Sequence, residues 1–171
     1  REICVTVDLR RSFKTDPSQD ICNLSTSITP RTYRVEEEAF LGTLKRVSKS
    51  IDELKHTQAE LSGVVITEAQ EAIEYSQLLA LFQAARPQVL ETGKFTPTLT
   101  NIGIISPLQF GQITADDAYL VAPTIYAPGF CLGVSTYDNT LTLAVSYCEP
   151  AHKTEEVEAF MDLMEKELRS L

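Results

Sequence analysis

The chain has 171 residues, of which 43% are hydrophobic and 23% charged, as in a folded globular domain rather than a disordered one. Its formal net charge of −9 disfavours nucleic acid and anionic membrane surfaces as partners, because both require a basic face. The only two histidines, His56 and His152, lie far apart in the sequence, which nearly excludes a mechanism or a metal site built on clustered histidines within this chain.

Targeting signals and cysteine motifs are also missing from the sequence. No apolar run approaches the roughly 18 residues of a membrane-spanning helix, and the first ten residues lack the apolar stretch of a signal peptide. The four cysteines form no CxxC pair, so zinc-type spacing is absent. We therefore expect reduced, mostly buried thiols and a cytoplasmic protein without a membrane span, a metal site or a tightly bound cofactor.

The N-terminal segment alternates between two kinds of side chain, which predicts a β-strand. A second extended segment is expected over 23–29, closed by Pro30. One face of the first strand is apolar and the other is polar or small; these faces carry Ile3, Val5, Val7 and Leu9, and Cys4, Thr6, Asp8 and Arg10, respectively.

Three amphipathic helices are predicted from apolar residues at three- and four-residue steps. The first covers 35–61, with Gly63 as its stop signal. The second covers 67–85, where Thr67 and Gln70 match a capping box, the apolar end predicts burial, and Pro87 would end the helix. The third covers 154–170, with Thr154 as its N-cap.

From Thr96 onward the pattern turns to β-structure. Strands are expected over 99–106 and 118–126, and a hairpin over 130–148 turns through Asp138 and Asn139. A two-residue loop would pair Phe130 with Tyr147 and give the hairpin one bulky apolar face and one face of small residues. We expect something to pack closely on the small face, and a helix, another strand and a ligand tunnel are the candidates.

These elements predict one α/β domain over 1–171. Its mixed, largely antiparallel sheet would be packed with three main helices on one or both faces. The order of elements is strands, two long helices, several strands and a closing helix. We find no internal repeat and no low-complexity tract or long linker that would divide the chain.

Known catalytic motifs are missing, since the chain has no Gly-x-Ser-x-Gly elbow, P-loop or GxGxxG. His56 is expected to be solvated and His152 to lie in a loop. Two places are less ordinary. Arg10 would need a carboxylate partner if its strand were interior, and a partly buried Asn101 would need fixed partners while Gly103 leaves room for a close approach. On residue chemistry alone, structural roles are favoured for both.

The order of several short motifs resembles the C-terminal half of the chloramphenicol-acetyltransferase-like superfamily. That group includes nonribosomal peptide condensation domains, alcohol acetyltransferases and polyketide-associated acyltransferases. Each motif is weak alone, and their order and spacing over nearly the whole chain carry the resemblance. They are Val7-Asp8-Leu9-Arg10, Cys22-Asn23, an amphipathic helix, Thr100-Asn101-Ile102-Gly103, the 130–147 hairpin and a closing helix.

The resemblance implies one half of a fold with two similar subdomains and a tunnel between them. In the family, the second His of an HHxxxDG motif in the N-terminal subdomain is the general base. It activates a hydroxyl or amine that attacks an acyl thioester on coenzyme A or on a carrier protein. This chain has no adjacent His pair. The resemblance therefore implies a subdomain that is inactive alone and has no catalytic residue of its own, whether it is expressed separately or is a piece of a cleaved enzyme.

Five positions carry implied roles. Arg10 matches the arginine that pairs with the motif's aspartate, although Arg11 leaves the register open by one. Asn23 matches a Gly-Asn step in which Cys22 replaces the glycine. Thr100, Asn101 and Gly103 match a Ser-Asn-x-Gly segment that lines the tunnel.

The implied donor is acyl-CoA or a phosphopantetheine-linked acyl group. The implied partners are the N-terminal half of the same enzyme and a carrier protein, and an exposed subdomain face would favour self-association. Two other readings stay open. One is a non-catalytic binding or protein-interaction module of the same fold, and the other is an unrelated α/β ligand-binding domain.

Overall fold

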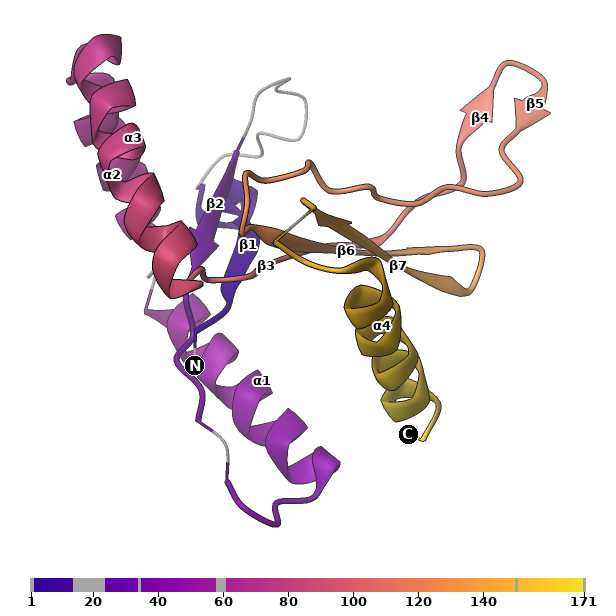
Figure 1. Ribbon diagram of the computed structural model, residues 1–171. Coiled ribbons are helices and arrows are strands. Elements are labelled where there is room, and N and C mark those ends of the chain that lie inside the picture. Colours follow the sequence, from indigo (N-terminus) through magenta and orange to yellow (C-terminus); the bar gives the residue numbers. More distant parts are fainter. Residues whose placement is uncertain (1, 14–23, 34, 58–60, 150, 171) are drawn as a thin grey trace.

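The computed structural model describes residues 2–13, 24–33, 35–57, 61–149 and 151–170. The α/β class is confirmed, because five strands form a mixed sheet in the order β2-β1-β3-β6-β7 and helices accompany it (Figure 1). The sheet strands are β1 (Cys4–Asp8), β2 (Ser25–Ile28), β3 (Thr98–Ile104), β6 (Phe130–Tyr137) and β7 (Thr140–Tyr147). The other elements are η1 (Leu9–Ser12), α1 (Phe40–His56), α2 (Leu61–Glu71), α3 (Tyr75–Thr92), β4 (Gln109–Phe110), β5 (Ile113–Thr114) and α4 (Thr154–Arg169).

The centre of the sheet is parallel and its edges are antiparallel. β1 is parallel to β3, with Cys4 opposite Thr98, and β3 is parallel to β6. β2 and β7 are antiparallel to their neighbours, as β4 is to β5. Three of the five pairings among the described residues are thus antiparallel, and parallel β1 and β3 run toward the same edge of the sheet.

The β6–β7 hairpin has the predicted register. Phe130 lies opposite Tyr147, and every pair up to Tyr137 and Thr140 follows in step. Asp138 and Asn139 take φ values of 43° and 61°, and two positive φ angles are the signature of a type I′ turn. The turn therefore sets which residues share each face.

An extended segment of the same chain covers the small-residue face of this hairpin. The prediction of a strand over 118–126 is wrong, because these residues form no ladder. Side chains bind them instead: the Leu120 N–H donates to Ser135 Oγ over 3.0 Å, and the Ser146 hydroxyl donates to the Ala122 carbonyl. A Cβ on Gly133 would lie 3.1 Å from the Leu120 carbonyl oxygen. The small residues thus admit this backbone, which excludes both a packed helix and an open tunnel there.

α4 packs on the bulky face of the hairpin. Phe160 meets Phe130 edge to face, with ring centroids 5.4 Å apart. Thr154 is the first helical residue and Lys153 the N-cap, so the predicted cap is wrong by one position. The Thr154 hydroxyl is hydrogen-bonded to the Tyr147 hydroxyl instead, which ties the start of α4 to the end of β7.

The other helices differ from their predicted bounds. The expected helix over 67–85 is two helices, and Thr67 is not a cap, since its hydroxyl donates to the Gly63 carbonyl inside α2. Gly63 does not stop a helix; a side chain there would collide with Thr26 of β2, so the glycine lets α2 approach the sheet. Pro87 lies inside α3, which ends at Gly93 in the left-handed conformation.

Two parts of the molecule extend away from the sheet. α2 and α3 project on the side of β2, and the β4–β5 ribbon, which the sequence analysis missed, projects on the opposite side (Figure 1). The expected burial of the apolar end of the predicted 67–85 helix is wrong: Leu81 and Phe82, which lie in the first half of α3, are 64% and 57% exposed, because no described element packs over them. Within the described residues, no helix is both long and apolar enough to cross a membrane.

Candidate functional site

The Thr-Asn-Ile-Gly segment forms an irregular step in β3. The pairing with β6 shifts register between Asn101 and Ile104, and Gly103 takes a φ of 73°. The Asn101 Oδ1 accepts a hydrogen bond of 2.8 Å from the Gly103 N–H. The asparagine side chain thereby satisfies a backbone donor that the bulge removes from the ladder.

This bulge is open to its surroundings. Asn101 is exposed rather than partly buried as expected. No atom of the described chain lies within 4 Å of the place where a Gly103 Cβ would stand. Within this chain, glycine is therefore required by its positive φ rather than by a close neighbour, and the space beside it can admit a partner or a ligand.

Thr100 and Asn101 face opposite sides of the sheet. Thr100 pairs with Gly133 on the small-residue face, whereas Asn101 pairs with Val134 on the bulky face. Successive side chains of a strand alternate in this way. The two residues can therefore contribute to one channel only if the channel passes around the sheet edge.

Arg10 does not continue the first strand as predicted. β1 ends at Asp8, and Arg10 belongs to the 3₁₀ turn η1. The Asp8 Oδ1 caps this turn by accepting the Arg10 backbone N–H over 2.9 Å, and it also accepts the guanidinium over 3.2 Å. With 36% of its side chain exposed, Arg10 has a carboxylate partner two residues away within its own chain.

The predicted site residues thus come together only in part. Because β1 and β3 run parallel, η1 and the β3 bulge leave the same edge of the sheet, which is where parallel sheets usually bind ligands. Asn23 and Cys22 lie outside the described residues. We call this edge, with Arg10, Thr100, Asn101 and Gly103, the β1–β3 edge.

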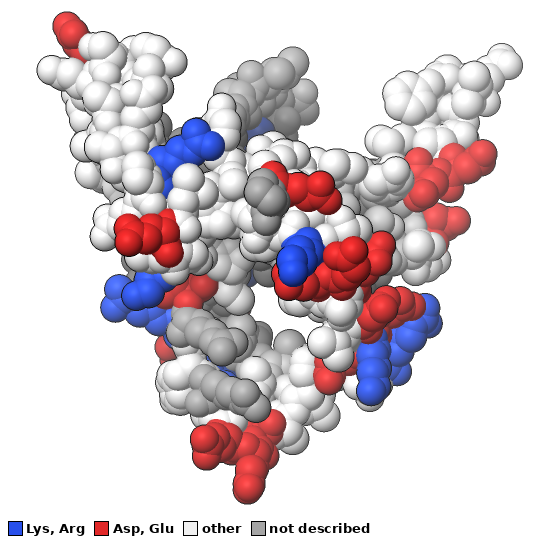
Figure 2. Space-filling model, viewed as in Figure 1, with Lys and Arg blue, Asp and Glu red and all other residues white. Residues whose placement is uncertain are grey.

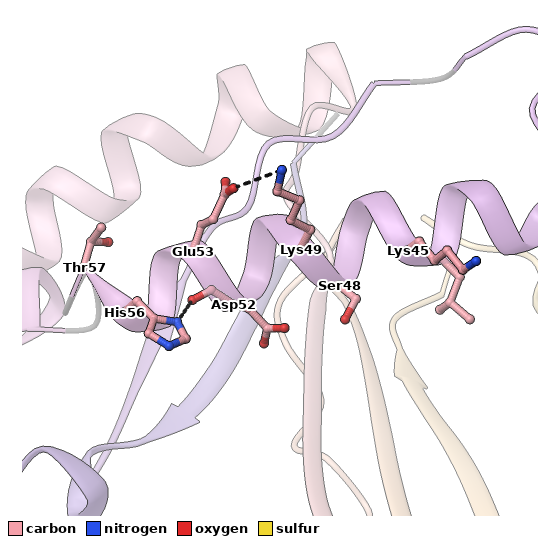
Figure 3. A pocket seen from close by; sticks show the side chains of 8 residues that line it. Lys45, Ser48, Lys49, Asp52, Glu53, His56 and Thr57 are labelled. Atoms are coloured by element: carbon pink, nitrogen blue, oxygen red, sulfur yellow. Dashed lines mark hydrogen bonds and ion pairs between the residues drawn. The ribbon is translucent and has the colours of Figure 1, made fainter.

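The two histidines lie away from the β1–β3 edge, and the ring of each is hydrogen-bonded to a backbone carbonyl. Nδ1 of His56, which is exposed as expected, lies 2.6 Å from the Asp52 carbonyl oxygen at the end of α1. Figure 3 shows the ring in a shallow surface pocket beside the Lys49–Glu53 ion pair. His152 lies in the loop before α4, as expected, with Nε2 2.8 Å from the Pro128 carbonyl oxygen. These contacts are typical of structural histidines.

The ionisable groups indicate stabilising rather than catalytic roles. Burial raises the pKa of the Cys131 thiol, which therefore stays protonated near neutral pH and is a poor nucleophile. Glu38 precedes α1, and its carboxylate lies 2.7 Å from the guanidinium of Arg46 within that helix. Hydrogen bonds from Arg46 and Thr43 lower the pKa of Glu38. Cys4, Cys131 and Cys148 are free thiols.

A second hollow, which the sequence analysis did not foresee, lies beneath the sheet. It has a volume of about 1040 Å³ and lies at the amino-terminal ends of β3 and β6, on the α4 side. The one signal for it was the bulky hairpin face with Phe130 and Leu132, which a helix covers only in part.

The chemistry available at the β1–β3 edge is that of binding and positioning. It offers a hydroxyl, an amide, a guanidinium and open space beside a glycine. Among the described residues, no group of three His, Cys, Asp or Glu side chains could hold a metal ion. No protein-family model, curated protein or solved structure matches this chain.

Proposed function

We propose that this chain is the C-terminal subdomain of an acyltransferase or condensation-type enzyme related to chloramphenicol acetyltransferase. The complete enzyme moves an acyl group from a thioester, on coenzyme A or a carrier protein, to a hydroxyl or amine. An HHxxxDG-bearing subdomain supplies the base, because this chain has only two separate histidines.

The observation that carries the proposal is the large surface that the chain leaves exposed. Its accessible surface is 13098 Å², whereas a compact monomer of 19.0 kDa exposes roughly 8,400 Å². The excess, roughly 4,700 Å², is larger than the roughly 1,000–2,500 Å² that each partner contributes to a typical obligate interface. A chain with this much exposed surface would bury a large part of it by binding a second subdomain.

The position of the uncharged surface supports the same conclusion. The faces of the two projections that are visible in Figure 2 carry almost no charged residues, while Asp and Glu gather around the sheet and α4. Large apolar side chains are exposed on both projections, among them Val65, Leu81, Phe82, Phe110 and Ile113. Patches of this kind mark interaction sites.

In the proposed reaction, the base in the partner subdomain takes the proton from the acceptor hydroxyl or amine. The acceptor atom attacks the thioester carbonyl carbon, the carbon–sulfur bond breaks, and the thiol leaves with the proton that the base returns. Asn101 lines the channel on the bulky face of the sheet, Thr100 borders it only where the channel passes around the sheet edge, and Gly103 leaves room for the substrate. Arg10 is a positioning residue that shares its guanidinium between Asp8 and the partner's carboxylate.

The test is reconstitution. The 171-residue chain is mixed with an HHxxxDG-bearing N-terminal half encoded upstream of it, and thiol release from an acyl-CoA is followed with an alcohol acceptor. We expect release only in the mixture. Arg10→Ala should lower its rate roughly tenfold or more, while the control Arg31→Ala, in an exposed ion pair with Glu2, leaves the rate unchanged. Turnover by the isolated chain would overturn the proposal.

A non-catalytic interaction module of the same fold is the second candidate, favoured by the uncharged projections. An upstream sequence without HHxxxDG would select it. In either case we place the protein in the cytoplasm, where its free thiols stay reduced, with its second subdomain, and for the enzyme also a carrier protein, as partners.

A further inference from the structure

The hollow beneath the sheet has two chemically distinct regions. Its floor is apolar, and its rim is polar and lies where the chain enters β3 after α3. Figure 2 shows the surface hollowed beneath the sheet, between α1 and α4. The floor includes Leu99, Phe130, Leu132, Phe160 and Met164, and the rim includes Glu2, Thr32, Lys94, Thr96 and Thr98.

Two aromatic rings in mutual contact and a nearly buried leucine form most of the floor. Phe130 and Phe160 brace each other edge to face, and Leu132 is only 9% exposed. α1 contributes no residue to the lining. A volume of about 1040 Å³ is slightly above the usual range for ligand sites, about 300–1,000 Å³, and the apolar floor favours an apolar chain.

Of the two charged side chains on the rim, Glu2 and Lys94, only Lys94 lacks an ion-pair partner within the described residues. Glu2 is neutralised by Arg31, whose Nε lies 2.8 Å from the carboxylate. Lys94 follows the Gly93 cap of α3, and within the described parts of the chain its ammonium has no ion-pair partner. Thr96 lies on the same rim, whereas Thr98 pairs with Cys131 and so turns its side chain to the small-residue face of the sheet.

We propose that this hollow binds a long-chain carboxylate, with the apolar chain on the floor and the carboxylate at Lys94 and Thr96. The polarity of the lining matches an amphipathic anion better than a wholly apolar ligand. The site lies at the amino-terminal end of β3, ahead of the bulge that begins at Asn101, and does not depend on the proposed acyl transfer. Its occupant is a small molecule rather than a protein strand.

The test compares dodecanoate with dodecan-1-ol, which share the chain length and differ in the charged head group. Titration calorimetry of the full chain should show one dodecanoate bound. Lys94→Gln should weaken dodecanoate roughly three- to tenfold, the effect of one partly exposed charge pair, and leave dodecan-1-ol within twofold. The control Lys166→Gln removes a lysine of α4 outside the hollow and should change neither affinity.

Filling the floor is the complementary test. Met164→Trp should weaken both ligands more than tenfold while the helical circular dichroism is kept, and Phe160→Trp replaces it if that signal is lost. Failure of both ligands to bind, or equal loss for both in Lys94→Gln, would overturn the proposal. Affinity that rises on dilution as a dimer dissociates would assign the hollow to a second copy of the chain and also overturn it.

Discussion

Gly103 shows how one backbone angle can shape a candidate site. Its φ of 73° lies in the left-handed region, and the Asn101 side chain holds the bulge by accepting the Gly103 N–H. Nothing in the described chain crowds the position. The conformation, rather than packing, is therefore what a substitution would disturb.

We predict a ranked series at this position. Gly103→Asn, which tolerates the left-handed region, should cost least in free energy of unfolding; Gly103→Ala should cost about 1 kcal/mol, and Gly103→Val the most. Urea unfolding followed by circular dichroism measures the three differences. Equal costs for Asn and Val would show that the bulge does not hold the positive φ in solution.

The sequence contained a signal for this bulge that its reading as a plain strand missed. An Asn two residues before a Gly is typical of a side chain that bonds its own backbone and opens a turn. The sequence held no such signal for Arg10, because the alternation of apolar and polar side chains continues from Val7 through Leu9 and predicts that the strand goes on. The Asp8 side chain ended the strand by capping the next turn.

At the scale of elements, the predictions succeeded where local chemistry decides. The Asp138–Asn139 turn determines its own register, so the hairpin could be derived pair by pair. The prediction of a strand over 118–126 failed because the order of side chains in this segment is typical of a strand, while its backbone is hydrogen-bonded to serine hydroxyls of the β6–β7 hairpin. Two-residue strands such as β4 leave no periodicity to detect.

Tyr137 anchors both ends of the β4–β5 ribbon. Its hydroxyl donates to the Ala115 carbonyl over 2.8 Å and accepts the Leu108 N–H over 3.4 Å. The ring itself is 6% exposed at the end of β6. One buried hydroxyl therefore connects the projecting ribbon to the core of the sheet.

We predict that Tyr137→Phe frees the ribbon while it keeps the ring. The loss of two hydrogen bonds should cost about 1–2 kcal/mol and speed proteolytic cleavage within 105–115. Limited proteolysis with mass spectrometry measures the site and rate. Tyr119→Phe is the matched control, because that ring is 56% exposed, and cleavage at equal rates in both variants would contradict the anchoring role.

For the whole molecule, the exposed surface sets the expected response to denaturant. An unfolded chain of 19.0 kDa exposes roughly 27,600 Å², so folding to 13098 Å² buries about half of that surface instead of the usual two thirds or more. We predict a urea m-value about three quarters of that of a compact protein of this length, rising when the partner subdomain binds. A full-sized m-value for the isolated chain would show that it is more compact in solution.

The parallel pairing of β1 with β3 has a consequence for biosynthesis. Cys4 pairs with Thr98, and the ribosome must add every residue between them before this pair can form. At about 5–20 residues per second, β1 and β2 leave the ribosome several seconds before their central neighbour. The β6–β7 hairpin, by contrast, closes through a two-residue loop, on a timescale of about 1–10 μs. During synthesis, β1 and β2 are therefore exposed for several seconds without their central neighbour, and the sheet is complete only after β3 and the hairpin have followed.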